Sequence, residues 1–197
     1  MTARLARSAW PLLALLLALA AWLLQSQPTE RWDWQPALVW QQPWRWWSAA
    51  AVHWSARHLQ MNLAGAALLA WLGWRAAAGW RASAAWALAW PLTQLGLLAQ
   101  PALAHYGGLS GVLHAGMAVL AMQLLRRPGR ERWLGGLIAC GLLLKIATEQ
   151  PWAGPLRQVP GWDFALAPAA HLSGALVGAA CGLLLTRRDT ARAAHTA

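Results

Sequence analysis

The most constraining feature of this sequence is a series of apolar stretches, each close to the length that crosses a lipid bilayer. A helix of about 20 residues crosses the hydrocarbon core, and six stretches of this 197-residue chain approach that length. We therefore expect an all-α polytopic membrane protein with six transmembrane helices, forming one domain over residues 1–197. The expected spans are 9–24, 57–74, 82–100 (interrupted by Pro91), 110–125, 133–148 and 165–186.

The first stretch also fits a signal peptide, because Arg4 and Arg7 precede a short apolar run. The residues that follow it, 25–28, offer no small-x-small cleavage site. We therefore expect a retained signal anchor.

Composition excludes several other classes of protein. Apolar types make up 58% of the chain and charged types 11%, whereas soluble domains carry about 25% charged residues and disordered chains are poor in apolar ones. The net charge of +10 sits in short clusters between apolar runs, so we expect no nucleic-acid partner. Cys140 and Cys181 lie in apolar runs without Cys/His spacing, so no metal site, disulfide or cofactor is expected.

The orientation follows from the Arg and Lys residues outside the spans. Eleven lie on the side of the two termini and four on the other side, so both termini are expected in the cytoplasm. The long non-cytoplasmic loop, residues 25–56, holds seven of the 17 tryptophans and is expected to lie in the membrane interface as short helices. The eleven are Arg4, Arg7, Arg75, Arg81, Arg126, Arg127, Arg130, Arg132, Arg187, Arg188 and Arg192, and the four are Arg31, Arg45, Arg57 and Arg157.

Polar residues inside the spans are costly to bury and therefore mark candidate functional sites. His58 and Asn62 are four residues apart, so they share one helix face and can both donate to one acceptor. A pair that only bridges two helices is the alternative.

The second group is Gly107-Gly108-Leu109-Ser110-Gly111, followed by His114. Glycines before a serine at the start of a span predict a loop that enters a helix N-terminus, where free N–H groups stabilise an oxyanion. Gly108 and Gly111 would let a peptide approach the hydroxyl. A helix-capping serine with glycine neighbours is the alternative.

The third group combines His171 with Gly174, Gly178 and Gly182. Small residues every four positions form a face that another helix can approach closely. His171 lies near this face, where it can reach the helix that fills the groove. A packing motif with an incidental histidine is the alternative.

Together the three groups supply the parts of a serine protease. Ser110 needs an adjacent base, which His171 provides, and the pair His58 and Asn62 would hold the oxyanion. No aspartate inside a span is placed to orient His171, since Asp163 lies in the preceding loop. We therefore expect a Ser–His dyad and no triad.

These motifs resemble those of the rhomboid intramembrane serine proteases. The matching residues, in chain order, are Trp44-Arg45 in the first loop, His53, the HxxxN of His58 and Asn62, GxSG at 108–111, and AHxxGxxxG at 170–178. The resemblance implies that Ser110 is the nucleophile, that His171 is its base, and that His58, Asn62 and the Ser110 N–H form the oxyanion hole. Rhomboids often have an acidic residue before Trp-Arg, where this chain has Gln42-Pro43.

Within that family the chain is most similar to the rhombosortase branch, on the evidence of GLSGVLH at 108–114 and of Lys145, Glu149 and Gln150. The similarity implies a membrane-anchored protein substrate with a C-terminal Gly-Gly motif, a transmembrane tail and a basic end. It also implies the inner membrane of a bacterium, with the active site toward the periplasm.

Two further residue pairs have open roles. His114 shares a helix face with Ser110 and can either stack on His171 or bond to a neighbouring helix. Lys145 and Glu149 are four residues apart and can pair; we expect a structural role, with a substrate contact by Glu149 as the alternative.

Two other classes of protein remain as alternatives. A non-catalytic rhomboid-fold protein would bind membrane helices, but such relatives usually lack the serine or the histidine. A small transporter would favour inverted repeats, and we find none.

Overall fold

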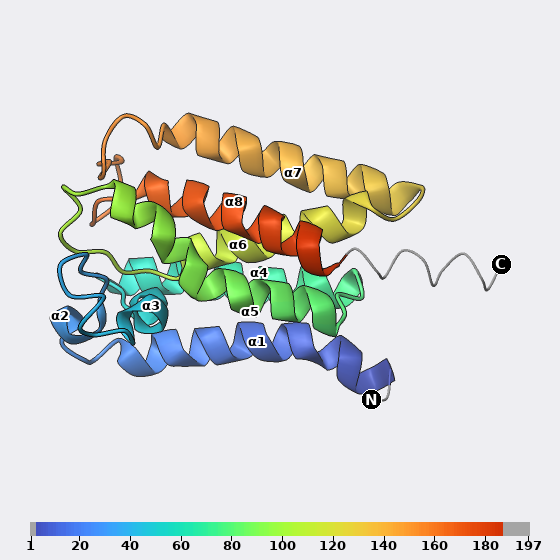
Figure 1. Cartoon of the computed structure of the whole chain (residues 1–197), viewed down its shortest axis with the longest axis horizontal. Helices are drawn as coiled ribbons and strands as arrows, with labels where there is room; N and C mark the ends of the chain where they lie inside the picture. The colour runs from blue at the N-terminus through green and yellow to red at the C-terminus, as the bar shows by residue number, and fades with distance from the viewer. Residues whose placement is uncertain (1–2, 187–197) are drawn as a thin grey trace.

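The computed structural model describes residues 3–186, which form a bundle of long helices (Figure 1). The start of α1 and the end of α8 lie at the same end of the bundle, and the short helices α2 and α3 lie at the opposite end. We refer to that opposite end as the loop end. The long helices are α1 (Ala3–Leu24), α4 (Ala56–Arg75), α5 (Trp80–Leu92), α6 (Ser110–Leu125), α7 (Arg130–Glu149) and α8 (Pro168–Leu185).

These helices cover most of each expected span, with two differences. The expected span 82–100 is helical only to Leu92 and continues as a 3-10 segment, η2 (Thr93–Ala99), because Pro91 cannot donate a backbone hydrogen bond. The last helix begins at Pro168, a residue type suited to the first turn, and not at residue 165. Three of the arginines that predict the orientation of the chain lie outside the described residues, namely Arg187, Arg188 and Arg192.

Judged by length and composition, one described helix, Pro168–Leu185, is long and apolar enough to cross a membrane, and Ser8–Leu24 and Ser110–Leu125 are shorter apolar helices. The six-span arrangement therefore stays a prediction.

Helices α6 and α8 lie in close backbone contact. A Cβ atom added at Gly174 would lie 2.0 Å from the Gly111 carbonyl oxygen, and one at Gly178 would lie 2.2 Å from the Ala115 oxygen. Only glycine permits this approach, as expected for a small-xxx-small face. The contact holds the first turns of both helices side by side.

A tryptophan-rich core joins α1, α4, α5 and α6. Trp10 is fully buried, contacts Trp86 at 4.6 Å between ring centroids, and donates its indole N–H to the Leu69 oxygen at 2.9 Å. Trp86 donates to the Val112 oxygen at 2.8 Å. Buried indoles need such acceptors, so these bonds fix the register of the four helices.

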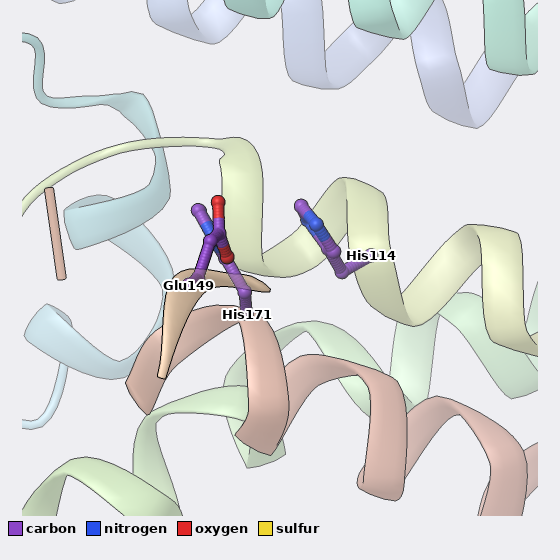
Figure 2. A group of neighbouring side chains, drawn as sticks. All are labelled: His114, Glu149 and His171. Carbon is purple, nitrogen blue, oxygen red and sulfur yellow. The ribbon is translucent and has the colours of Figure 1, made fainter. Parts of the chain in front are cut away.

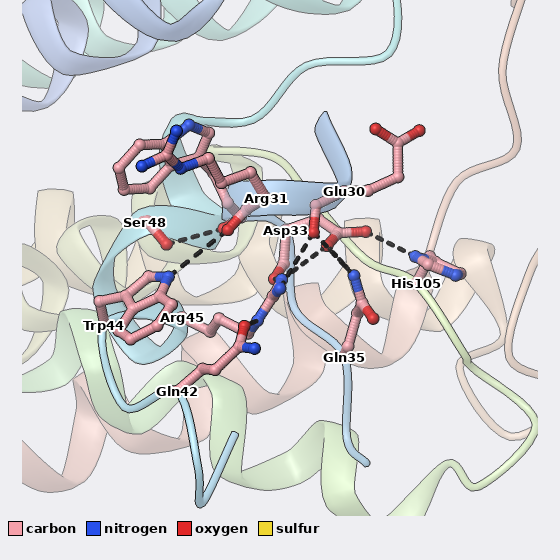
Figure 3. Close-up of polar contacts among 10 residues, drawn as sticks. Glu30, Arg31, Asp33, Gln35, Gln42, Trp44, Arg45, Ser48 and His105 are labelled. Atoms are coloured by element: carbon pink, nitrogen blue, oxygen red, sulfur yellow. Dashed lines mark hydrogen bonds and ion pairs between the residues drawn. The ribbon is translucent and has the colours of Figure 1, made fainter. Parts of the chain in front are cut away.

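The loop between α1 and α4 is held together by polar contacts of the Arg45 side chain (Figure 3). It contains α2 (Thr29–Trp32), α3 (Arg45–Ser48) and a 3-10 turn, η1 (Ala49–Ala51), so the expected short helices are present. Arg45 is 3% exposed and pairs with the fully buried Asp33 at 2.9 Å, while its Nε donates to Gln42 Oε1 at 2.7 Å. Gln42 thus accepts a hydrogen bond from Arg45, just before the Trp44-Arg45 pair, where an acidic residue is often found in the family that the sequence resembles.

The neighbouring Trp44 is 45% exposed and donates weakly to the Arg31 oxygen. A backbone pairing of Trp34 with Tyr106 joins this loop to the segment before α6. The loop therefore supports the N-terminus of α6.

Candidate active site

Ser110 and His171 meet across α6 and α8 at the loop end of the bundle. His171 Nε2 lies 2.8 Å from Ser110 Oγ, within hydrogen-bonding distance. Ser110 is the first residue of α6, and His171 lies in the first turn of α8. The contact that the sequence predicts between these side chains is present. It is the arrangement in which an imidazole can take a proton from a hydroxyl.

Gly108 brings the backbone close to His58. Its φ of +138° lies in the region that favours glycine, and an added Cβ would lie 2.8 Å from His58 Nε2. Gly111 has a different place from the one we expected. It faces Ala170 and Thr93 in the helix packing, each within 3.0 Å of an added Cβ, and so belongs to the interface with α8 and not to a path for substrate.

His58 and Asn62 lie on α4, on the face that borders the same site, and each is 5% exposed. The Trp54 backbone N–H donates to His58 Nδ1 at 3.4 Å, so the neutral ring carries its proton on Nε2. The ring of Phe164 stacks on His58 at 4.0 Å between centroids. These contacts hold His58 Nε2 next to Gly108, two residues before Ser110.

Two titratable groups outside the helices are held neutral by burial. Burial lowers the pKa of His53 to about 4, and its ring lies 4.7 Å from that of His58. Burial also raises the pKa of the Tyr106 phenol, which donates to the Gly108 oxygen at 3.2 Å. Both groups therefore stay uncharged, and the Tyr106 hydrogen bond holds the loop before Ser110.

His114 stacks on His171, which decides between the two roles that we left open for it. The ring centroids lie 4.2 Å apart and the planes differ by 8°. His114 Nδ1 donates to the Ser110 carbonyl oxygen at 2.7 Å, within its own helix. The ring is thus fixed as a flat surface against the His171 imidazole.

We expected a Ser–His dyad because no aspartate inside a span is placed to orient His171, but a glutamate carboxylate lies beside it. Glu149 Oε2 lies 2.6 Å from His171 Nδ1 (Figure 2), and Glu149 Oε1 contacts Lys145 Nζ, as expected for that pair. Asp163 is near His171 in sequence, whereas Glu149 comes from the last turn of α7. The signal was available: successive spans alternate in direction, so the end of this helix and the start of the next one share one side of the bundle.

The ligand atoms of His114, Glu149 and His171 lie within 4.8 Å of one another, close enough to suggest a metal site. The geometry does not fit one. Both nitrogens of His171 already contact Ser110 and Glu149, and the in-plane lone pairs of the two histidines lie in two separate, nearly parallel planes. Lone pairs in stacked planes do not converge on a common ion.

A cavity of about 420 Å³ opens from these residues between α4, α6 and α7. Its lining contains both polar and apolar side chains. Its size suits a few extended residues of a peptide. The polar lining is His58, Asn62, Ser110, His114, Lys145, Glu149 and His171, and the apolar lining includes Met61, Leu68, Leu113, Met117 and Leu142.

A rhomboid domain matches residues 40–188, which include every residue of this site. The chain belongs to the rhomboid family. Rhomboid proteins are intramembrane serine proteases that act on membrane-protein substrates within the bilayer, so this chain is a membrane protein of a protease family. A comparison with curated proteins found no matching relative.

Proposed function

We propose that this rhomboid is an active serine endopeptidase in which Ser110 is the nucleophile and His171 the general base. The observation that carries the proposal is the 2.8 Å contact between Ser110 Oγ and His171 Nε2 at the end of a cavity. A serine that only caps a helix would not need an imidazole from another helix as its partner. A non-catalytic rhomboid that only binds membrane helices, the alternative function, would not need that contact.

In the proposed reaction, His171 Nε2 accepts the Ser110 proton as the hydroxyl attacks a peptide carbonyl. The oxyanion is held by His58 Nε2–H, the Asn62 side-chain amide and the Ser110 backbone N–H, which is unpaired at the start of α6. His171 then gives its proton to the leaving amine. Water, activated in the same way, releases the acyl group from Ser110.

The substrate would reach Ser110 between α4 and α7. Both helices line the cavity, and the residues of its apolar part include Met61, Leu68 and Leu142. An apolar transmembrane segment would fill this part, while its unwound end extends to Ser110. Helices resist cleavage, and glycine unwinds them readily. A Gly-Gly sequence next to a membrane helix therefore fits this geometry.

We infer accordingly that the substrates are secreted proteins with a C-terminal Gly-Gly motif, a membrane helix and a basic tail, as in the rhombosortase branch. The protein would lie in the bacterial inner membrane, with its termini in the cytoplasm and Ser110 near the periplasmic face. The Arg clusters support this orientation. So does the shared position of the start of α1 and the end of α8 at the end opposite the site (Figure 1).

The test uses the purified protein in lipid vesicles with a single-span substrate that carries Gly-Gly before its helix. Mass spectrometry of the released fragment identifies its new C-terminus. Cleavage next to the glycines by the wild type, lost in Ser110→Ala, supports the proposal. Equal cleavage when both glycines are replaced by leucine would contradict the substrate assignment, and full activity of Ser110→Ala would contradict the nucleophile.

A further inference from the structure

The carboxylate of Glu149, His171 and Ser110 form a continuous chain of hydrogen bonds from α7 through α8 to α6. Glu149 Oε2 lies 2.6 Å from His171 Nδ1, and His171 Nε2 lies 2.8 Å from Ser110 Oγ. Glu149 is 8% exposed and His171 is 5% exposed. Their contact is therefore made away from solvent, where a polar group needs a partner.

We propose that Glu149 is a positioning residue that turns the pair of Ser110 and His171 into a Ser–His–Glu triad; this rests on the proposed protease function. The carboxylate accepts the N–H of His171 Nδ1, which leaves the lone pair of Nε2 facing the Ser110 hydroxyl. When Nε2 takes the serine proton, the adjacent negative charge stabilises the imidazolium. Glu149 itself stays ionised, and the proton passes from Nε2 to the leaving amine.

Lys145 fixes which oxygen of Glu149 faces the histidine. Lys145 lies one helical turn before Glu149, and its Nζ contacts Oε1 of the carboxylate. Oε2 therefore remains available for His171 Nδ1. Both carboxylate oxygens are thus engaged within the protein. This leaves little capacity for the substrate contact that was the alternative role of Glu149.

The contact with Lys145 also determines what an amide at position 149 would do. In Glu149→Gln the side-chain oxygen must accept from Lys145 Nζ, which has no lone pair to receive an N–H. The amide NH₂ then faces His171 Nδ1 and donates to it. This places the imidazole proton on Nε2, so His171 can no longer accept the proton of Ser110.

The same reasoning predicts that removing the lysine rescues the amide. In the double variant Lys145→Met/Glu149→Gln, the amide is free to turn its oxygen toward Nδ1 and restore the productive tautomer. If Glu149 acted only by holding α7 to α8, the double variant would be less active than either single variant, because it loses more contacts. The rescue therefore separates positioning from packing.

The experiment measures kcat and KM for the Gly-Gly substrate in vesicles, with thermal unfolding recorded for each variant. The matched control is Glu131→Gln, which removes a half-exposed carboxylate in the first turn of α7, where it pairs with Arg127 from the connection before the helix. We expect Glu149→Gln to lower kcat by about 100-fold to 10⁴-fold with little change in KM. Lys145→Met alone should cost less than about tenfold, and the double variant should exceed Glu149→Gln by roughly tenfold.

Three results would overturn the inference: kcat of Glu149→Gln equal to that of Glu131→Gln, a double variant slower than Glu149→Gln, or a loss that appears in KM alone. Should Glu149→Gln not fold, Glu149→Asp takes its place, since a shorter carboxylate must lower kcat if distance to Nδ1 matters, and an unchanged kcat contradicts the proposal. If the wild type also leaves the substrate intact, the proposed function fails and the triad falls with it. A wild type that depends on Ser110 but not on Glu149 contradicts the triad alone.

Discussion

Replacing Gly174 by alanine should separate the catalytic pair without touching either member. The added Cβ would lie 2.0 Å from the Gly111 carbonyl oxygen, whereas real Cβ contacts essentially never fall below 3.0 Å. The obstacle is backbone, which cannot rotate away as a side chain can. Helices α6 and α8 must therefore move apart by about 1 Å at this level.

That displacement is large on the scale of the site. Gly174 lies one turn from His171, and Gly111 is next to Ser110, so a 1 Å separation would lengthen their 2.8 Å contact to about 3.8 Å, beyond hydrogen-bonding range. A 1 Å misplacement of reacting groups costs about 100-fold, or roughly 2.7 kcal/mol of transition-state stabilisation. Overpacking should also lower the free energy of unfolding by about 1–3 kcal/mol.

The assay is kcat/KM for the Gly-Gly substrate at a temperature below the unfolding transition of every variant. The matched control is Gly141→Ala on α7, where an added Cβ meets nothing within 4 Å. We expect the Gly174→Ala value to fall about 100-fold and the control to match the wild type. A Gly174→Ala enzyme with wild-type kcat/KM would refute the claim that this glycine sets the distance between Ser110 and His171.

Three other changes give distinct outcomes. Asn62→Ala should lower kcat by about 100-fold or more, as loss of one oxyanion donor does, and an unchanged kcat for the Gly-Gly substrate would remove Asn62 from the oxyanion hole. Arg45→Met should lower the free energy of unfolding by about 3–5 kcal/mol, because it leaves the fully buried Asp33 without this partner; thermal unfolding in detergent within error of the wild type would contradict this. Because burial lowers the pKa of His53 from 6.5 to about 4, only the unfolded chain binds this proton between those values, and stability should fall with falling pH by up to about 1.4 kcal/mol per unit in that window. His53→Gln should have a smaller pH slope there, and an identical slope would show that His53 does not titrate in this way.

The residues that meet at the site could be predicted because their spacing carries the information. The four-residue steps of Gly174, Gly178 and Gly182 predict a close helix contact, and His171 at its edge predicts a partner on the neighbouring helix. Ser110 after Gly107 and Gly108 predicts a helix start. Each of these patterns is local, so a single sequence is enough to find it.

Glu149 and Gly111 show where such reasoning stops. The alternating direction of the spans places Glu149 on the same side of the bundle as His171. Which helices are adjacent, and how far each extends, decides its partner, and neither is encoded in the spacing around Glu149. Gly111 fits the GxSG pattern equally well whether it faces a substrate or α8. The pattern does not specify how the helix is rotated about its axis, which decides the side that Gly111 faces. The sequence around Pro91 likewise does not reveal that Ser173 of α8 contacts η2, where its hydroxyl donates to the Thr93 oxygen and accepts from the Gly96 N–H.

The central claim is that the hydroxyl of Ser110 is activated by the imidazole of His171. The most direct measurement is the rate of covalent modification by a fluorophosphonate, followed by peptide mapping of the adduct, since this reagent reports an activated serine without any assumption about the substrate. The account predicts one adduct, on Ser110, that is absent in Ser110→Ala and forms far more slowly in His171→Ala. An adduct on another serine, or equal rates in the wild type and His171→Ala, would contradict it.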